Sequence, residues 1–260
     1  PIAAPHGTTT CDETLLRAAS ELAAEKNAVF TLHASEMDYE MKAFAERGET
    51  PTSYLKKIGA LNPRLLAAHC IHLSDADIER MKESGAAVAH CIGSNTKAAK
   101  GVAPIAALAK AGVRYGLGTD GPSSGNTLSM FDQMRLFAVC HKTANHDRGI
   151  FPARDIVRAA TRGGAEALGA GDEFGQIRPG MRADMVLVSV DAPHMFPVYN
   201  PYSALVYGAN SSDVRYVMAG GKMRVRDGVL TQLDMGEAKA RLLEHMGAFI
   251  KSAEKYRDII

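Results

Sequence analysis

The sequence predicts an α/β fold in which parallel strands and helices form part of a TIM-like (β/α)8 barrel. Short apolar runs alternate with amphipathic segments through the first two-thirds of the 260 residues, which is typical of a parallel sheet covered by helices. An ionisable side chain follows each apolar run, as expected where strand ends converge on one mouth. After about residue 151 short strands and turns replace this pattern, which predicts a second, smaller β-domain.

Five apolar segments are the predicted strands: residues 2–4, 28–32, 65–68, 86–89 and 113–117. A complete barrel of this type has eight strands. We therefore expect an incomplete barrel, about strands 4 to 8. The chain also begins at Pro1 rather than at a methionine, so the sequence is interpreted as a C-terminal fragment whose remaining strands precede Pro1.

The first helix is expected to follow Asp12, a favourable N-cap residue. Its helical spacing predicts one apolar face made of Leu15, Leu16, Ala19, Leu22 and Ala23.

Two later helices are also marked by residues that favour helix ends. Ser74 and Asp77 have the spacing of a capping box, and Gly85 is expected to end that helix. Pro104 is expected to begin a second helix that ends at Gly112.

The last third of the chain is expected to leave the barrel. Residues 152–161 and 163–168 are predicted as two short helices. The expected domains are then the partial barrel with the active site over 1–178, part of a small β-sandwich over 179–232, and a C-terminal helix over 233–260.

The residues that follow the predicted strands are the candidates for chemistry: His6, His33, His69, His90 and Asp120. His90 is expected to be a packing residue, and His72 is assigned to a loop because it would face away from His69. The other histidines are expected to be solvated, namely His141, His146, His194 and His245. Imidazole and carboxylate groups at one mouth suit a metal site or proton transfer.

An ordered set of motifs carries a family resemblance. They are His33-Ala34-Ser35-Glu36, Ala67-Ala68-His69-Cys70-Ile71-His72, Ser94-Asn95 with Gly101-Val102-Ala103-Pro104, Gly118-Thr119-Asp120-Gly121 and Pro179-Gly180-Met181-Arg182-Ala183-Asp184. Together they resemble the amidohydrolase superfamily of metal-dependent hydrolase barrels. Within it the chain is most similar to the 5-methylthioadenosine/S-adenosylhomocysteine deaminases.

The resemblance implies a role for each matched residue. His33 and Asp120 match metal ligands, and Asp120 also matches a catalytic base. Glu36 matches the acid that protonates a ring nitrogen, and His69 matches the histidine that polarises the nucleophile. One divalent metal is implied, zinc foremost, with iron, manganese or nickel as alternatives.

The resemblance also implies a substrate and two contacts to it. His6 and Ser124 match substrate-binding positions. The implied reaction is hydrolytic deamination of an adenosine-type nucleoside such as 5-methylthioadenosine or S-adenosylhomocysteine, with release of ammonia.

Two departures from the family pattern keep alternatives open. The sequence has no His-x-His pair. The family places such a pair on its first barrel strand, where both histidines are metal ligands. The isolated chain is therefore expected to bind metal weakly and to be inactive, or to serve as a scaffold. Residues 91–95 read Cys-Ile-Gly-Ser-Asn where the family often has Asn-Pro-x-Ser-Asn. That change leaves room for an aminohydrolase or chlorohydrolase of a triazine, pterin or guanine-type ring.

Composition limits the partners. A net charge of +1 argues against nucleic acid, and the absence of an apolar run of about 18 residues argues against a membrane span. The four cysteines show neither disulfide nor zinc-site spacing, which favours a cytoplasmic protein. We expect a small heterocyclic substrate and a possible homo-oligomer.

Overall fold

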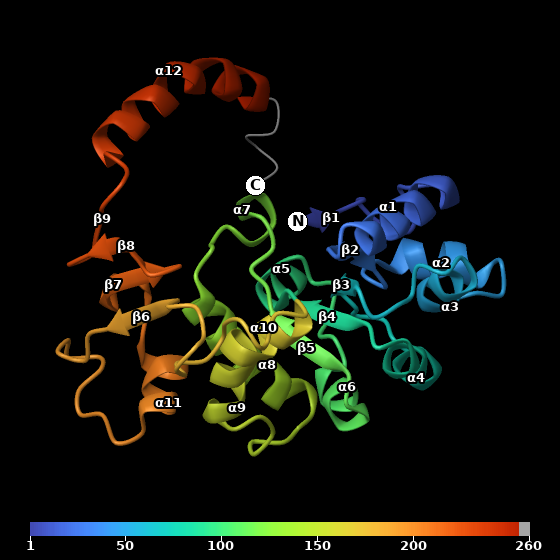
Figure 1. The fold of residues 1–260 in the computed structure, drawn as a ribbon, viewed down its shortest axis with the longest axis horizontal. Coiled ribbons are helices and arrows are strands. Elements are labelled where there is room, and N and C mark those ends of the chain that lie inside the picture. The colour runs from blue at the N-terminus through green and yellow to red at the C-terminus, as the bar shows by residue number, and fades with distance from the viewer. Residues whose placement is uncertain (255–260) are drawn as a thin grey trace. The chain divides into compact units, whose positions relative to one another are not determined.

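The computed structural model describes residues 1–254, and the chain divides into two compact units (Figure 1). The first unit comprises Pro1–Arg182 and Val190–Ser211, and the second comprises Ala183–Ser189 and the chain from Ser212 onward. Residues 190–211 were expected in the β-domain and instead belong to the first unit. Their apolar side chains explain this, because Met195 and Val206 are buried there and Arg135 donates a hydrogen bond to the Ala209 carbonyl (3.0 Å).

A five-stranded parallel sheet forms the centre of the first unit, in the order β1-β2-β3-β4-β5. The strands are β1 (Ile2–Ala3), β2 (Val29–Ala34), β3 (Leu65–His69), β4 (Ala87–His90) and β5 (Arg114–Leu117). All five predicted strands are confirmed. Because every pair is parallel, all carboxyl ends lie at one edge of the sheet, where parallel α/β folds place their sites.

Helices follow the strands along the chain and cover the sheet. They are α1 (Glu13–Glu25), α2 (Asp38–Ala45), α3 (Pro51–Lys57), α4 (Asp75–Ser84), α5 (Ile92–Lys97), α6 (Ile105–Ala111), α7 (Pro122–Gly125), α8 (Met130–Ala144), α9 (Ala153–Arg158) and α10 (Gly164–Ala167). The core between sheet and helices contains Phe30 and Leu65 from the strands, and Leu16, Leu108 and Phe137 from the helices.

The first helix confirms its predicted cap but not its predicted face. The Asp12 carboxylate accepts a hydrogen bond from the Leu15 amide (2.8 Å). Leu16 and Ala23 are buried, whereas Leu15 and Leu22 are half exposed. The contact with the sheet is therefore a narrow stripe, and residues one position away from it turn toward the surface.

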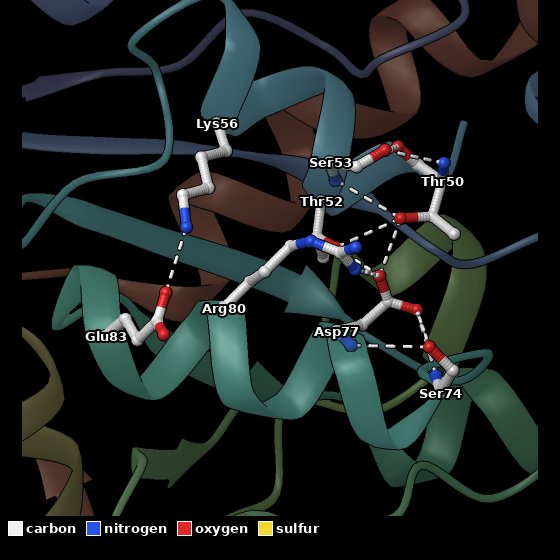
Figure 2. A network of polar contacts seen from close by, with 8 residues as sticks. All are labelled: Thr50, Thr52, Ser53, Lys56, Ser74, Asp77, Arg80 and Glu83. Atoms are coloured by element: carbon white, nitrogen blue, oxygen red, sulfur yellow. Dashed lines mark hydrogen bonds and ion pairs between the residues drawn. The ribbon is translucent and has the colours of Figure 1, made fainter. Parts of the chain in front are cut away.

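Helix α4 confirms the predicted capping box (Figure 2). Ser74 and Asp77 cap each other's backbone, and the Thr50 and Thr52 hydroxyls at the start of α3 also donate to the Asp77 carboxylate. Burial acts to raise the pKa of Asp77, but these hydrogen bonds outweigh burial and lower the pKa below its ordinary value. The helix ends at Gly85 in the left-handed conformation (φ 68°). As expected, α6 begins after Pro104 and ends at Gly112.

The two short helices predicted over residues 152–168 are one continuous helical run. A π-helical turn at Ala159–Gly163 joins α9 to α10. The glycines of this run allow close packing, because a Cβ on Gly163 would lie 2.9 Å from the Tyr115 carbonyl oxygen. A Cβ on Gly116 would lie 2.5 Å from the Gly164 Cα. The helix therefore continues and lies directly against β5.

The second unit is built on a four-stranded antiparallel sheet in the order β6-β7-β8-β9. Its strands are β6 (Met185–Val188), β7 (Val214–Ala219), β8 (Lys222–Arg226) and β9 (Val229–Leu230), followed by helix α12 (Met235–Ala253). Two short helical segments of the first unit, α11 (Pro201–Ser203) and a π-turn (Ala204–Gly208), come before β7 in the chain, and a 3-10 turn (Ser211–Asp213) stands at the boundary between the units. The end of the expected C-terminal helix, residues 255–260, lies outside the described residues. The predicted class, an incomplete barrel with a small sheet domain, is confirmed.

The cysteines of residues 1–254 are free. Cys70 and Cys91 are buried as small apolar groups, and burial raises the pKa of the Cys91 thiol to about 12.

In the same range, every helix is too short or too polar to cross a bilayer.

Candidate active site

Three of the predicted site residues meet at the carboxyl edge of the parallel sheet. His33 lies on β2, Glu36 follows that strand, and His69 ends β3. One ligand atom from each lies within 4.8 Å of the others. The parallel register pairs Ala34 with His69, so the fold itself sets these side chains next to one another.

His33 is held by the loop that follows β1. Its Nδ1 and its backbone amide (3.0 Å) both donate to the His6 carbonyl oxygen. Because Nδ1 carries the hydrogen, Nε2 carries the lone pair of the neutral ring. The exposed His6 ring lies 4.8 Å from that of His33, and its Nδ1 is paired with the Thr10 hydroxyl (2.6 Å).

Glu36 takes part in an ion pair that the sequence did not predict. The Lys100 Nζ lies 2.5 Å from Glu36 Oε1, and His69 Nε2 lies 3.6 Å from the same oxygen. Lys100 is 64 residues away in sequence. Such a pair leaves no local spacing signal, and only the fold brings the two groups together.

His69 is the most enclosed member of the cluster, with 1% of its surface exposed. Its ring stacks on that of His33 with 5.1 Å between centroids, and its Nδ1 donates to Asn95 Oδ1 (2.7 Å). Burial lowers the pKa of His69 below its ordinary value. The imidazole is therefore neutral near pH 7, with its Nε2 lone pair on the side of Glu36.

Asp120 follows β5 in the left-handed conformation (φ 59°), which aspartate tolerates better than most residues. Burial acts to raise the pKa of Asp120. The facing Ser94 hydroxyl, a hydrogen bond from the Gly121 amide (2.7 Å) and the nearby His69 and His33 rings outweigh burial and hold the pKa of Asp120 below its ordinary value. Asp120 is thus an ionised carboxylate in electrostatic reach of both histidines.

Ser124 and the His72 ring have polar partners other than His33, Glu36 and His69. Ser124 belongs to α7, and its carbonyl accepts a hydrogen bond from Lys97 (2.9 Å). Within residues 1–254 no hydrogen bond or ion pair joins Ser124 to the cluster of His33, Glu36 and His69. The ring of His72 is half-buried, and its Nε2 lies 3.6 Å from the Asp38 carboxylate.

His141 contradicts its expected solvated position. It is buried in α8 with its Nε2 3.0 Å from that of His90 at the end of β4, beside the Phe137 ring. Burial lowers the pKa of both histidines, that of His141 to about 4. The α8 helix turns this face toward the sheet, which the sequence interpretation did not anticipate.

A cavity of about 370 Å³ lies at the opposite end of β5 from Asp120. Arg114, Tyr115 and Asp155 contribute to its wall. Arg114 is engaged there by the carbonyls of Gly85 and Glu166. His33, Glu36, His69 and Asp120 do not line this cavity. They lie at the carboxyl edge of the sheet.

Comparison with known proteins gives the family. The model of the amidohydrolase family matches residues 1–224. The chain belongs to the amidohydrolase family. The 5-methylthioadenosine/S-adenosylhomocysteine deaminase of Syntrophobacter fumaroxidans is 39% identical over 239 residues, which cover 92% of this chain and 55% of that protein. The chain thus spans about half the length of the curated relatives it matches.

Two solved structures are also similar to the chain. An adenosine deaminase from Xanthomonas campestris with bound zinc superposes with a TM-score of 0.85 at 34% identity, over 98% of this chain and 56% of that one. The atrazine chlorohydrolase TrzN from Arthrobacter aurescens TC1, complexed with zinc, has a TM-score of 0.85 at 28% identity, over 92% of this chain and 53% of that one.

The amidohydrolase cluster has the chemistry of a zinc site. Imidazole nitrogens and carboxylate oxygens are common ligands of catalytic zinc. His33 donates its Nδ1 hydrogen to a backbone carbonyl, which is the arrangement that fixes the tautomer of a metal-binding histidine. Asp120 is held ionised by its surroundings. His33 and Asp120 therefore offer donor types that a divalent metal takes, while the ligand atoms that lie within 4.8 Å of one another are those of His33, Glu36 and His69.

Proposed function

We propose that this chain carries the catalytic groups of a metal-dependent deaminase of adenosine-type nucleosides, such as 5-methylthioadenosine or S-adenosylhomocysteine. The observation that carries the proposal is the meeting of His33, Glu36 and His69 at one strand edge in a chain of the amidohydrolase family. The similarity to a 5-methylthioadenosine/S-adenosylhomocysteine deaminase and to an adenosine deaminase supports this substrate class.

His33 and Asp120 are the residues proposed to hold the metal, with zinc foremost and iron, manganese or nickel as alternatives. A bound divalent metal supplies Lewis acidity, which makes water nucleophilic near neutral pH. The ionised Asp120 carboxylate accepts a proton from the attacking water. A low pKa keeps the Asp120 carboxylate charged, which favours binding of a cation. The same low pKa makes Asp120 a weaker base toward water.

Glu36 and His69 act on the substrate side. Glu36, paired with Lys100, passes a proton to the ring nitrogen beside the amino-bearing carbon. Asp120 passes the proton that it took from water to the amino group, so the carbon–nitrogen bond breaks and ammonia leaves. The ring carbon keeps the oxygen of water as a carbonyl, and the remaining hydroxyl proton returns to Glu36. His69, fixed by Asn95 through Nδ1, faces the reacting centre with Nε2. The Nε2 lone pair accepts a hydrogen bond from the attacking water and orients it, and once Nε2 has bound a proton it can donate to the oxygen on which charge develops. His6, beside His33, and Ser124 in α7 are proposed to contact the nucleoside.

Another heterocycle is the second candidate. The structural similarity to an atrazine chlorohydrolase supports it, as does the Cys91–Asn95 sequence beside the site. Under this second hypothesis, His33, Glu36, His69 and Asp120 hydrolyse a triazine, pterin or guanine-type ring.

A substrate panel separates the two candidates. The protein as it is produced naturally, loaded with zinc, is incubated with 5-methylthioadenosine, S-adenosylhomocysteine, adenosine, guanine, an aminopterin-type ring and a chlorotriazine. Ammonia and chloride release are measured. We expect ammonia from the adenosine-type nucleosides with the highest kcat/KM. A higher kcat/KM for the triazine or pterin, with no nucleoside turnover, would favour the second candidate and exclude the first.

A further inference from the structure

Glu40 is a charged side chain with 4% of its surface exposed, in the first turn of α2. A carboxylate is rarely buried unless donors surround it. Glu40 has four of them. They are the Thr8 hydroxyl and the backbone amides of Ser35 (3.0 Å), Glu36 (2.8 Å) and Met37 (3.4 Å).

This set of donors exceeds what capping α2 requires. The N-cap residue of α2 is Met37, which has no polar side chain, and Glu40 at the third helical position supplies the reverse half of a capping box. The Ser35 and Glu36 amides precede the N-cap, so they belong to the loop between β2 and α2. Glu40 therefore binds the loop that carries Glu36 in addition to its own helix.

The other side of the same loop is fixed by the segment that follows His69. The Ser35 carbonyl accepts hydrogen bonds from the Ile71 amide (2.8 Å) and the His72 amide (3.0 Å). Ser35 itself has a φ of 52°, a left-handed conformation that serine adopts only when its surroundings impose it. The peptide groups on both sides of Ser35 are thus bonded, which fixes the direction in which the Glu36 side chain leaves the backbone.

Thr8 connects the same carboxylate to a third loop. It lies two residues after His6, whose carbonyl holds the His33 ring, and its buried hydroxyl donates to Glu40 Oε1. Glu40 therefore joins the loop after β1 to the loop after β2. The loop after β3 is attached through Ser35.

We propose that Glu40 is a positioning residue for the deamination reaction: it holds the loop at Ser35–Met37 so that Glu36 meets the substrate ring at the correct place. The proposal rests on the proposed function of Glu36. Glu40 acts through the backbone and does not touch the substrate, so its removal affects the rate of the reaction rather than substrate binding.

Glu40→Gln is the most direct variant. A glutamine keeps the shape but offers one acceptor oxygen and one NH2 group, so two of the four donors face another donor. A displacement of about 1 Å at a reacting group can cost roughly 10²-fold in rate. In the zinc-loaded natural protein we expect kcat to fall by about that factor, with KM changed by less than about twofold. An unchanged kcat in folded Glu40→Gln protein would overturn the proposal.

Asp77→Asn is the matched control. Asp77 is also a buried carboxylate, 1% exposed, that caps a helix of the same unit and collects hydroxyl donors (Figure 2). Its partners are Thr50 and Thr52 at the start of α3, Ser74 before α4 and Arg80 within α4. They do not include the proposed site residues. We expect Asp77→Asn to lower the urea midpoint at least as much as Glu40→Gln does, while kcat stays within about twofold of wild type. An equal loss of kcat in both variants would mean that Glu40 acts only through stability.

A double-mutant cycle tests whether Glu40 acts through Glu36. In a Glu36→Gln background, the added Glu40→Gln change should alter kcat by less than about twofold, because the group being positioned has lost its function. Two losses that multiply would contradict the proposal.

Thr8→Val removes one donor to Glu40 and disturbs the fold less. We expect a smaller loss of kcat, with the same dependence on Glu36.

Amide hydrogen exchange gives a readout that does not require deaminase activity. In wild type the amides of residues 35–37 should be protected, and Glu40→Gln should release them selectively while the β3 amides keep their protection. If exchange changes in this way but no nucleoside is deaminated, the proposed function fails and the role of Glu40 in the loop stands. If exchange at residues 35–37 is unaffected, the positioning role fails.

Discussion

His90 and His141 show how one buried pair of imidazoles differs from the pair at the strand edge. Their Nε2 atoms lie 3.0 Å apart among aromatic rings, whereas His33 and His69 lie with Glu36 and Lys100. Without a carboxylate partner, burial keeps both His90 and His141 uncharged. At the residue scale, the neighbours of a histidine decide whether it packs or reacts.

The low pKa of His141 predicts a loss of stability in acid. The unfolded histidine has a pKa of about 6.5, and in the fold the pKa is about 4. Between these values the unfolded chain binds more protons, so the free energy of unfolding falls as the pH falls below about 6.5. We expect His141 to account for a loss of about 2 kcal/mol between pH 7.5 and pH 5, with His90 acting in the same direction.

Urea unfolding at pH 7.5, 6 and 5 checks this expectation. A His141→Gln variant removes the titrating group but keeps a polar partner for His90, and its stability should depend less on pH than that of wild type. The same pH dependence in both proteins would show that His141 is not responsible.

At the scale of elements, local patterns were sufficient where a signal lay within a few residues. Apolar runs located the five strands, and the Ser74–Asp77 spacing located the start of α4. Where packing between distant segments decides, local patterns failed. Residues 152–168 were predicted as two helices and instead form one run, in which Gly163 and Gly164 allow a close approach to β5. The position of His141 depends on which face of α8 meets the sheet.

In the candidate site, too, local sequence patterns identified some residues, and packing between distant segments determined the others. His33, Glu36, His69 and Asp120 were identified because each follows a predicted strand in a recognisable motif. Lys100 and Glu40 were not identified from the sequence. The bond of Lys100 to Glu36 spans 64 residues, and Glu40 has the pattern of an ordinary acidic residue in the first turn of a helix. Their contacts with the site exist only once the segments that follow β1, β2 and β4 lie at the same edge.

At the scale of the whole molecule, the 260 residues offer His33 and Asp120 as the proposed metal ligands and no His-x-His pair. Catalytic zinc is usually held by three protein ligands. We therefore expect the 260-residue chain by itself to bind zinc weakly in isothermal titration calorimetry and to release no ammonia from 5-methylthioadenosine. Tight one-to-one zinc binding with turnover by this chain alone would contradict that expectation.

The most direct test of the account is the deamination of 5-methylthioadenosine by the naturally produced protein and its Asp120→Ala variant, with Asp38→Asn as a control for an exposed carboxylate. Asp120 is proposed both to hold the metal and to accept a proton from water. We predict that kcat/KM of Asp120→Ala falls by at least roughly 10²-fold, while Asp38→Asn keeps the wild-type value. Undiminished deamination by folded Asp120→Ala protein would contradict the assignment of the reaction to this strand edge.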